Sequence, residues 1–568
     1  MSGMDYDYII AGGGSAGSAL AARLSARSAS KVLLLEAGID TPPGAEPAQV
    51  RDPYPTTVFC PQFMWPNLMV HFRPIPHNAP ETAVPRVYLQ GKVLGGGSSV
   101  NAMVAIRGQP GDFAEWEAAG AKGWGWDDVL PYYRKLERDT DYDGPLHGKD
   151  GPIAIRRHRR EQWPGFCHAM AAAMEKKGFA FHEDMNAQFD DGFCRVAMNN
   201  TPDQRISAAM GYLTAEVRAR PNLTVRTEAL VDRVIVEGGR AVGVAATIAG
   251  RPETIRGRSV IVSAGTLHSP QLLMRSGIGP AAMLQAAGIA PVHDLPGVGQ
   301  NLQDHPSVAL AMMLKRHARQ SPSIRAGGNV ALRWSSQVAD CANLDMYMGI
   351  NAKSSWNAVG RMIGGLILCV YKPYSKGSVT LVRNAGGAVA PRIAFNLFSD
   401  PRDLVRLKGA VQLAASLTED PAMRAATELA FPSSYSERLF ELNRHGAMKA
   451  VRAAVGAAAL DLAPGLRKTF VEKVASPGVR LADVLADDSS LEEWTRTNAT
   501  AFLHAAGTCR MGDADDPGAV VDTACRVRGV PGLYVADASV MPVIVRANTN
   551  LTTIMIAEKV ADGMLAAA

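Results

Sequence analysis

The stretch that decides the fold is residues 6–38, "YDYIIAGGGSAGSALAARLSARSASKVLLLEAG". It begins with a short apolar run, DYIIA, typical of a strand that is buried on both faces of a parallel sheet. Small and apolar residues at helical spacing follow, and then comes a second apolar run, KVLLLEAG. The order strand, turn, helix, strand within about 30 residues predicts an α/β fold.

The glycines of this stretch predict a bound dinucleotide. Gly12, Gly14 and Gly17 have G-x-G-x-x-G spacing. In such a Rossmann-like unit, the first glycine permits a tight turn, the second lets the backbone approach a pyrophosphate, and the third lets the helix pack close to the strand. Glu36 ends the second strand, where it can accept hydrogen bonds from an adenosine ribose. The stretch does not by itself choose between FAD and NAD.

A second glycine-rich block, "QGKVLGGGSSVNAMVAIRG", covers residues 90–108. Gly95, Gly96 and Gly97 allow another close approach of backbone, while Ser98 and Asn101 supply hydrogen-bonding groups. Taken alone, the block fits a flexible loop equally well.

Later segments return to the pattern of the first. Residues 221–246 predict a β-hairpin with its turn at Gly238–Gly239. Residues 259–279 repeat the strand, glycine and helix order, and "GLYVADASVMP" with "LTTIMIAEKVADGMLAAA" predicts a last strand and a closing amphipathic helix. Between residues 306 and 487 this pattern stops, and segments such as "GSVTLV" and "MKAVRAAVGAAALDLA" predict sheet and helix. We therefore expect a discontinuous nucleotide-binding domain with a second α+β domain inserted in it.

Composition excludes several functional classes. The net charge of +5 and the charged fraction of 20% give no sign of nucleic-acid binding. Seven scattered cysteines have no metal-ligand spacing, so we expect no metal site and a reducing compartment. No apolar run reaches the length of roughly 18 residues that spans a bilayer. We expect a cytoplasmic protein without a transmembrane segment, and the sequence makes no prediction of oligomeric state.

The chain resembles the glucose–methanol–choline (GMC) oxidoreductases, which are FAD-dependent enzymes. The resemblance covers nearly the whole chain, and its blocks occur in the order of the family. It is most similar to bacterial aryl-alcohol and hydroxymethylfurfural oxidases and to choline-dehydrogenase-like proteins. The blocks are "AGGGSAGSALAARLS" with "LLLEAG", "GKVLGGGSSVNAMVAIRG", "SAGTLHSPQLLMRSGIGP" with "LPGVGQNLQDHP", "HAAGTCRMG" with "GLYVADASVMP", and "ANTNLTTIMIAEKVAD".

The resemblance implies an FAD-binding domain of residues 1–155, 218–305 and 490–568, and a substrate-binding domain of residues 156–217 and 306–489. It places Ser15 and Ala16 at the pyrophosphate, and the backbone of Val231 at the adenine. Asp537 would lie near the phosphate and ribitol. Further contacts with FAD are implied for Gly12, Gly14, Gly17, Glu36, Trp65, Gly96, Asn101, Asn548 and Thr549. Some members attach FAD through a histidine at the position of Val100, so we expect non-covalent FAD here.

Oxidation of an alcohol requires removal of the hydroxyl proton and transfer of a hydride to the flavin. Among twelve histidines, the resemblance selects His504 as the base, because an imidazole can accept a proton near neutral pH. It selects Asn548 as the group that hydrogen-bonds the substrate oxygen. His305 is expected to be structural. The alternative for Asn548 and Asn550 is a capped turn before the last helix.

The expected reaction is oxidation of a primary alcohol, aromatic, furanic or aliphatic, to the aldehyde, with O2 as electron acceptor. A dehydrogenase that uses a quinone or another carrier remains open, as do, with less support, an FAD-containing lyase and an NAD-dependent or non-catalytic nucleotide-binding protein. Phe502, Leu503 and residues 366–373 are expected to form apolar pocket walls. The related hydroxymethylfurfural oxidases carry tryptophans at the positions of Leu503 and Cys369, so we expect a roomier pocket here.

Overall fold

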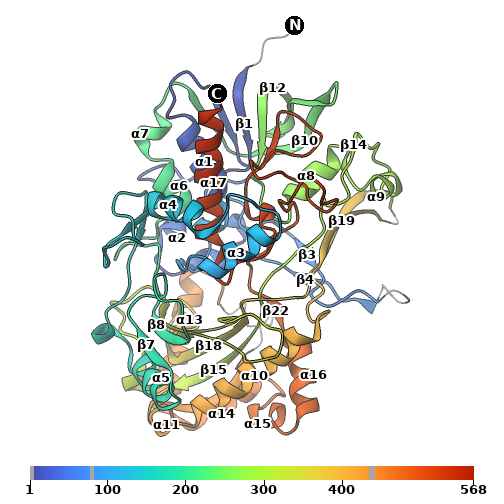
Figure 1. Ribbon diagram of the computed structural model, residues 1–568. Helices are drawn as coiled ribbons and strands as arrows, with labels where there is room; N and C mark the ends of the chain where they lie inside the picture. The colour runs from blue at the N-terminus through green and yellow to red at the C-terminus, as the bar shows by residue number, and fades with distance from the viewer. Residues whose placement is uncertain are drawn as a thin grey trace.

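The computed structural model describes residues 5–76, 78, 82–384, 386–433, 441 and 443–567. Two large β-sheets lie one above the other along the molecule, and the first and last described residues lie at the end that carries the first sheet (Figure 1). The second sheet, with a layer of helices below it, forms the other end of the molecule. The α/β architecture expected from the sequence is confirmed.

The first sheet is seven-stranded, in the order β10-β11-β12-β1-β2-β9, with β23 paired to β12. Its centre is parallel: β1 (Tyr6–Ala11) lies between β12 (Arg251–Val262) and β2 (Val32–Leu35). The last four residues of β1 and all of β2 are buried, as their apolar runs require. The remaining strands are β9 (Leu223–Arg226), β10 (Ala229–Glu237), β11 (Arg240–Ile248) and β23 (Leu533–Val535).

Three expectations for this sheet are confirmed. The hairpin β10–β11 turns at Gly238 and Gly239, whose φ values of 57° and 78° belong to the left-handed region that favours glycine. Residues 259–262 return the chain to the sheet as part of β12, and β23 adds the last strand.

The closing helix, α17 (Thr549–Ala566), is present, but its expected amphipathic character is wrong. α17 packs against α1 (Ser15–Leu24) and α4 (Trp126–Leu136) as well as the core (Figure 1), so buried residues occur around most of its circumference. The side chain of Glu558 in α17 is fully buried and forms an ion pair with Arg23 of α1 at 2.8 Å.

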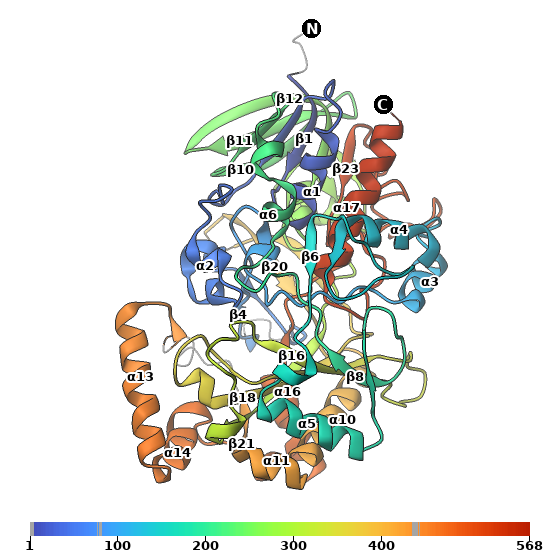
Figure 2. The same ribbon diagram turned by 90° about the vertical axis from the view of Figure 1, so that its left-hand side faces the viewer.

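The second sheet is eight-stranded and mainly antiparallel, in the order β21-β15-β18-β17-β16-β8-β7, with β22 paired to β15. Helices of the inserted segment cover the face that points away from the first sheet (Figures 1 and 2). The strands are β7 (Ala180–His182), β8 (Gly192–Arg195), β15 (Pro306–Leu314), β16 (Gly328–Trp334), β17 (Met346–Asn351), β18 (Ile363–Val370), β21 (Thr427–Ser433) and β22 (Thr500–Ala501).

The helix and strand predicted inside the inserted segment are both present, as α13 (Ala447–Leu462) and β19 (Ser378–Arg383), which pairs with β20 (Val389–Ala394). The other longer helices are α3 (Pro110–Ala118), α5 (Gly165–Lys176), α10 (Pro401–Thr418) and α16 (Asp488–Asn498). Shorter elements are α2 (Ala48–Arg51), α6 (Ala208–Tyr212), α7 (Ala215–Arg218), α8 (Ser269–Arg275), α9 (Ala281–Ala286), α11 (Pro421–Ala426), α14 (Gly465–Phe470), α15 (Leu481–Val484), β3 (Met69–Val70), β4 (Arg86–Val87), β5 (Glu137–Asp139), β6 (Ile153–Ile155), β13 (Ile278–Gly279) and β14 (His293–Asp294).

The chain passes twice from the first sheet into the second and back, as expected for an inserted domain. Two short elements join the halves: α6 packs on α1, and β22 pairs with β15. The boundaries given above stay a prediction. Among the residues that the structure describes, no helix is long and apolar enough to cross a membrane.

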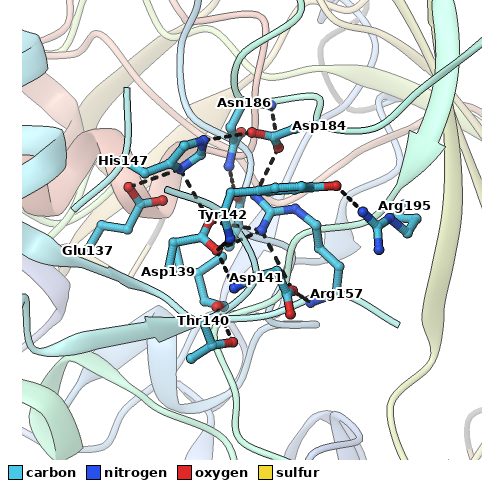
Figure 3. Close-up of polar contacts among 12 residues, drawn as sticks. Glu137, Asp139, Thr140, Asp141, Tyr142, His147, Arg157, Asp184, Asn186 and Arg195 are labelled. Atoms are coloured by element: carbon cyan, nitrogen blue, oxygen red, sulfur yellow. Dashed lines mark hydrogen bonds and ion pairs between the residues drawn. The ribbon is translucent and has the colours of Figure 1, made fainter. Parts of the chain in front are cut away.

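A buried cluster of charges fixes the segment around β5 and β6 (Figure 3). The Nδ1 atom of His147 lies 3.3 Å from Asp139 and 3.5 Å from Glu137, and its Nε2 atom lies 2.9 Å from Asp184. Burial lowers the pKa of His147, but hydrogen bonds to the three carboxylates outweigh it and raise the pKa to about 10. His147 is therefore protonated at neutral pH.

Two arginines complete this cluster. Arg107 binds Glu137 at 2.9 Å, and Arg157 binds Asp139 and Asp184 at 2.8 Å each. The three acidic side chains thus face two guanidinium groups and one imidazolium, which makes a neutral set. Glu137, Asp139 and His147 are close enough to hold a metal ion. Because the guanidinium groups already bind the carboxylates, we interpret the cluster as an ion-pair network.

Replacement of His147 by glutamine should lower the free energy of unfolding by about 3–5 kcal/mol, because a buried carboxylate loses its cation. The pKa of His147 is raised on folding, so its contribution is complete below its unfolded pKa of 6.5 and is lost as the pH rises toward 10. Urea unfolding at several pH values measures the difference. The variant of the exposed His317, His317→Gln, serves as control. An equal loss of stability at all pH values would contradict this account.

Candidate active site

A cavity of about 1580 Å³ lies between the two sheets. Its walls come from the carboxyl ends of the first sheet's parallel strands and from one face of the second sheet. Gly17 is absent from its lining and lies beneath it, against strand β1. All other predicted site residues line the cavity: Gly12, Gly14, Ser15, Ala16, Glu36, Trp65, Gly96, Asn101, Val231, His504, Asp537, Asn548 and Thr549.

The two glycine-rich blocks meet at one end of the cavity. A Cβ atom on Gly96 would lie 2.8 Å from the Cα atom of Gly14, and one on Gly17 would lie 1.9 Å from the carbonyl oxygen of Gly12. Only glycine fits these contacts. Helix α1 begins here, so its first N–H groups, which have no partner inside the helix, face the same end. This arrangement suits an anionic diphosphate.

Two buried carboxylates flank this end. Glu36 accepts hydrogen bonds from the N–H groups of Gly13 (2.8 Å) and Gly38 (2.7 Å), and its burial raises its pKa to about 7. Asp537 follows β23 and accepts from the N–H groups of Gly265 and Ser539, both at 2.8 Å. Each carboxylate is therefore fixed by backbone donors and retains lone pairs for a ligand's hydroxyl groups.

The lining also contains buried polar atoms without a partner among the described residues. These are Oε1 of Gln90 and Nε2 of His268. The ring of His268 lies 4.4 Å from that of Trp65, and the Nζ atom of Lys92 lies over the Trp65 ring at 5.0 Å from its centroid. Unpaired buried polar atoms are costly, so this part of the cavity fits a polar and aromatic ligand such as a dinucleotide.

Arg205 holds the second glycine-rich block in place. It is fully buried, and its Nη1 atom donates to the carbonyl oxygens of Ser98 (3.1 Å) and Asn101 (2.7 Å) and to the side-chain oxygen of Asn101 (2.8 Å). The amide nitrogen of Asn101 is thus the group left for a ligand. Sequence reasoning missed Arg205, because a single arginine among polar residues gives no signal.

His504 and Asn548 are brought together in the wall of the same cavity. The Nδ2 atom of Asn548 lies 3.0 Å from Nε2 of His504, and its Oδ1 atom accepts a hydrogen bond from Tyr371 at 3.1 Å. Asn548 occupies the N-cap position of α17 but makes no side-chain capping bond. Asn550 instead binds Ser15 at 2.7 Å. The capped-turn alternative is therefore wrong for both side chains.

A chain of hydrogen bonds fixes the protonation of His504. The Nε2 atom of His305 lies 3.1 Å from the carbonyl oxygen of Val545, which can only accept, so His305 carries its hydrogen on Nε2. Its Nδ1 atom then accepts from Nδ1 of His504, 2.9 Å away. The Nε2 atom of His504 is left unprotonated and accepts from Asn548.

His305, expected to be structural, and Asp304, for which the sequence made no prediction, both contact the segment that carries His504. His305 is fully buried and contacts His504 directly. Asp304 accepts from the N–H groups of Phe502 (3.1 Å) and His504 (3.0 Å), which holds Leu503 between them at a φ of 63°. Their place in "LQDHP", a polar pair inside a family block, was the available signal.

Burial sets the charge state of the two histidines, His504 and His305. It lowers the pKa of His504 to about 3, so the imidazole is neutral at physiological pH. It also lowers the pKa of His305 well below the usual value, with a smaller contribution from His504. An imidazole that is neutral and has its unprotonated Nε2 at the cavity is in the protonation state that a base requires.

The expected pocket walls are partly correct. Phe502, Leu503 and Ile367 line the cavity, and Leu503 is 47% exposed. Cys369 does not: it is fully buried in β18 and lies outside the lining, so its expected place at the pocket is wrong. Strand alternation puts Cys369 on the same face of β18 as Gly365 and Ile367. It is paired across the sheet with Ser307 and Tyr347, and it is covered there by neighbouring side chains.

Comparison with known proteins places the chain in a family. Two sequence profiles described as GMC oxidoreductase match residues 6–307 and 373–557. The chain is 42% identical to the 5-(hydroxymethyl)furfural oxidase of Methylovorus sp. (strain MP688), over 99% of this chain and 98% of that protein. It is 34% identical to the oxygen-dependent choline dehydrogenase of Sinorhizobium medicae, over 99% and 96%.

Among solved structures, the fold is similar to that of pyridoxine 4-oxidase from Mesorbium loti, with a TM-score of 0.79, 25% identity and 99% of both chains covered. The chain matches both family profiles. It also combines the contact between Gly14 and Gly96, the two fixed carboxylates and the His504–Asn548 pair. The protein belongs to the GMC oxidoreductases, a family of FAD-dependent enzymes.

Proposed function

We propose that this protein oxidises a primary alcohol to the aldehyde, with His504 as the base and Asn548 as its hydrogen-bonding partner. The observation that carries the proposal is the fixed tautomer of His504. Its Nε2 atom and the Nδ2 atom of Asn548 lie 3.0 Å apart at the cavity wall. An alcohol oxygen bound beside this pair can accept a hydrogen bond from Nδ2 of Asn548, while its own hydrogen replaces that of Asn548 at Nε2 of His504.

When bound, FAD accepts the hydride that leaves the alcohol carbon. The chain's own residues remove the proton and orient the substrate. His504 takes the hydroxyl proton on Nε2, and its Nδ1 hydrogen stays directed at His305. Asn548 is held by Tyr371 through its oxygen, so its nitrogen keeps one orientation and stabilises the developing alkoxide.

FAD would be held by the residues at the other end of the cavity. Gly12, Gly14, Ser15 and Ala16 would receive the diphosphate, Glu36 the ribose, and the backbone of Val231 the adenine. Asp537, Asn101 and Thr549 would bind the ribitol and flavin portion. Val100 lines the cavity and has no nucleophilic atom, so the attachment is non-covalent.

Apolar side chains at the reacting end favour aromatic, furanic or aliphatic alcohols. The curated relatives are named an oxidase and an oxygen-dependent dehydrogenase, which supports O2 as the electron acceptor. The proposal includes the domain boundaries given above and a cytoplasmic location. All seven cysteines are free and six are buried, as in a reducing compartment.

Gly96→Ala should abolish FAD binding without unfolding the protein. The added Cβ atom would press on the Cα atom of Gly14, and the φ of Gly96, 51°, favours glycine. The flavin absorbance per protein after purification measures occupancy. Gly563→Ala is the matched control, because a Cβ atom there meets nothing within 4 Å. Normal FAD content in Gly96→Ala would contradict the proposed diphosphate site.

His504→Ala should retain FAD and lose turnover by about 10²–10⁴-fold, the usual contribution of a general base. The rate of flavin reduction by alcohol under nitrogen isolates this step, and the flavin spectrum verifies the bound cofactor. His317→Ala, an exposed histidine, controls for loss of an imidazole. Wild-type reduction rates in His504→Ala would refute the assignment.

His305→Leu should lower the reduction rate by about 10–100-fold with unchanged FAD content, because His504 loses the acceptor that fixes its tautomer. A positioning role affects kcat more than KM, and it shifts the pH profile of kcat, since His504 is free to carry its proton on either nitrogen. An unchanged pH profile with a loss confined to stability would show that His305 is only structural.

A further inference from the structure

The cavity continues far beyond His504 along the second sheet. Tyr347, Gly349 and Asn351 of β17 line it on alternate positions, and Lys353, two residues beyond the end of this strand, lines it as well. Tyr347 marks the reacting end, since it stacks at 4.4 Å on Tyr371, which binds Asn548. Strand residues advance about 3.3 Å each, so Lys353 lies up to about 20 Å from Tyr347.

Small and apolar residues line this extension. The neighbouring strands contribute Ala309 and Ala311 from β15, and Gly365 and Ile367 from β18. Glycine and alanine at cavity-facing positions leave a channel, because larger side chains there would fill the space above the sheet. The channel therefore suits a long, unbranched apolar chain.

Lys353 is a buried lysine at the far end of this channel. It is 8% exposed, and its Nζ atom donates to the carbonyl oxygens of Arg325 and Ile324 and lies 4.6 Å over the ring of Tyr54. Within the described part of the chain, no carboxylate forms an ion pair with it. Neutral carbonyl groups compensate a buried ammonium only in part.

The charges around Lys353 leave an excess of positive charge. The nearby Asp52 is already paired with Arg325, and Arg361 adds a further cation. Burial, with Arg325 and Arg361, lowers the pKa of Lys353 to about 7. An anion at this place would pair with Lys353, whereas a quaternary ammonium would be repelled.

The cavity lining near the channel also carries positive charge. Lys449 and Arg452 of α13 line the cavity, and the carboxylate of Glu441, also in the lining, pairs with Arg444 at 2.6 Å. Among the described residues of this part of the lining, these cations thus outnumber the available carboxylates.

We propose that the substrate is a long-chain primary alcohol with a carboxylate at its opposite end, and that Lys353 binds this carboxylate. The inference rests on the proposed alcohol oxidation at His504 and adds the substrate class. The hydroxyl end lies at His504 and Asn548, the chain lies over the small residues of β15 and β18, and the carboxylate pairs with the ammonium group of Lys353.

The test compares ω-hydroxycarboxylates of increasing chain length with their methyl esters, which have nearly equal length and no charge. We expect the holoenzyme to prefer acid over ester by about 10–100-fold in kcat/KM, the effect of one charge-assisted hydrogen bond. The preference should be present for long chains and absent for short ones, which cannot reach Lys353.

Lys353→Met should remove the preference by raising KM for the long acids, while the esters and benzyl alcohol keep their wild-type kinetics. Lys376→Met, at an exposed lysine outside the cavity lining, is the control and should change nothing. Flavin content and thermal unfolding verify that each variant is folded.

The inference is overturned if the wild-type enzyme shows no acid preference at any length, or if Lys353→Met slows acid and ester equally. The wild-type comparison needs no variant, so a misfolded Lys353→Met leaves the inference testable. If benzyl alcohol and the esters are not oxidised at all, the proposed function itself fails. If they are oxidised without an acid preference, only the inference about Lys353 fails.

Discussion

One backbone carbonyl group, that of Val545, fixes the proton positions of the whole reacting centre. Because this oxygen can only accept a hydrogen bond, it determines the tautomer of His305, which in turn determines that of His504. Tyr371 orients Asn548 from the other side. The proposed base, His504, and its proposed partner, Asn548, are therefore arranged before any substrate binds, which is what rapid proton removal requires.

A second constraint places this centre beside the cofactor. The backbones at Gly14 and Gly96 approach so closely that a single Cβ atom would separate them. Their contact joins the start of α1 to the second glycine-rich block, which Arg205 holds in place by its hydrogen bonds to Asn101. The start of α17 reaches the same place through the bond between Ser15 and Asn550. Cofactor end and reacting end thus share one rigid wall.

The sequence predicted those features that depend on neighbouring residues, such as the strand–glycine–helix unit and the turn at Gly238–Gly239. It could not predict contacts between distant segments. His305 and Tyr371 reach the site only when β15 and β18 pair. Lys353 can be connected with substrate binding only because the fold places it in the cavity wall. The sequence predicts an amphipathic closing helix, because its threonines and alanines do not reveal that α1 and α4 cover them.

The most direct measurement of the central claim is the visible spectrum of the purified protein under nitrogen during addition of benzylic, furanic and aliphatic alcohols. The account predicts that the bound flavin loses its colour with a primary alcohol and regains it quickly when air is admitted. Slow return of the colour would make the protein a dehydrogenase with another acceptor. A flavin that no alcohol bleaches would contradict alcohol oxidation at His504.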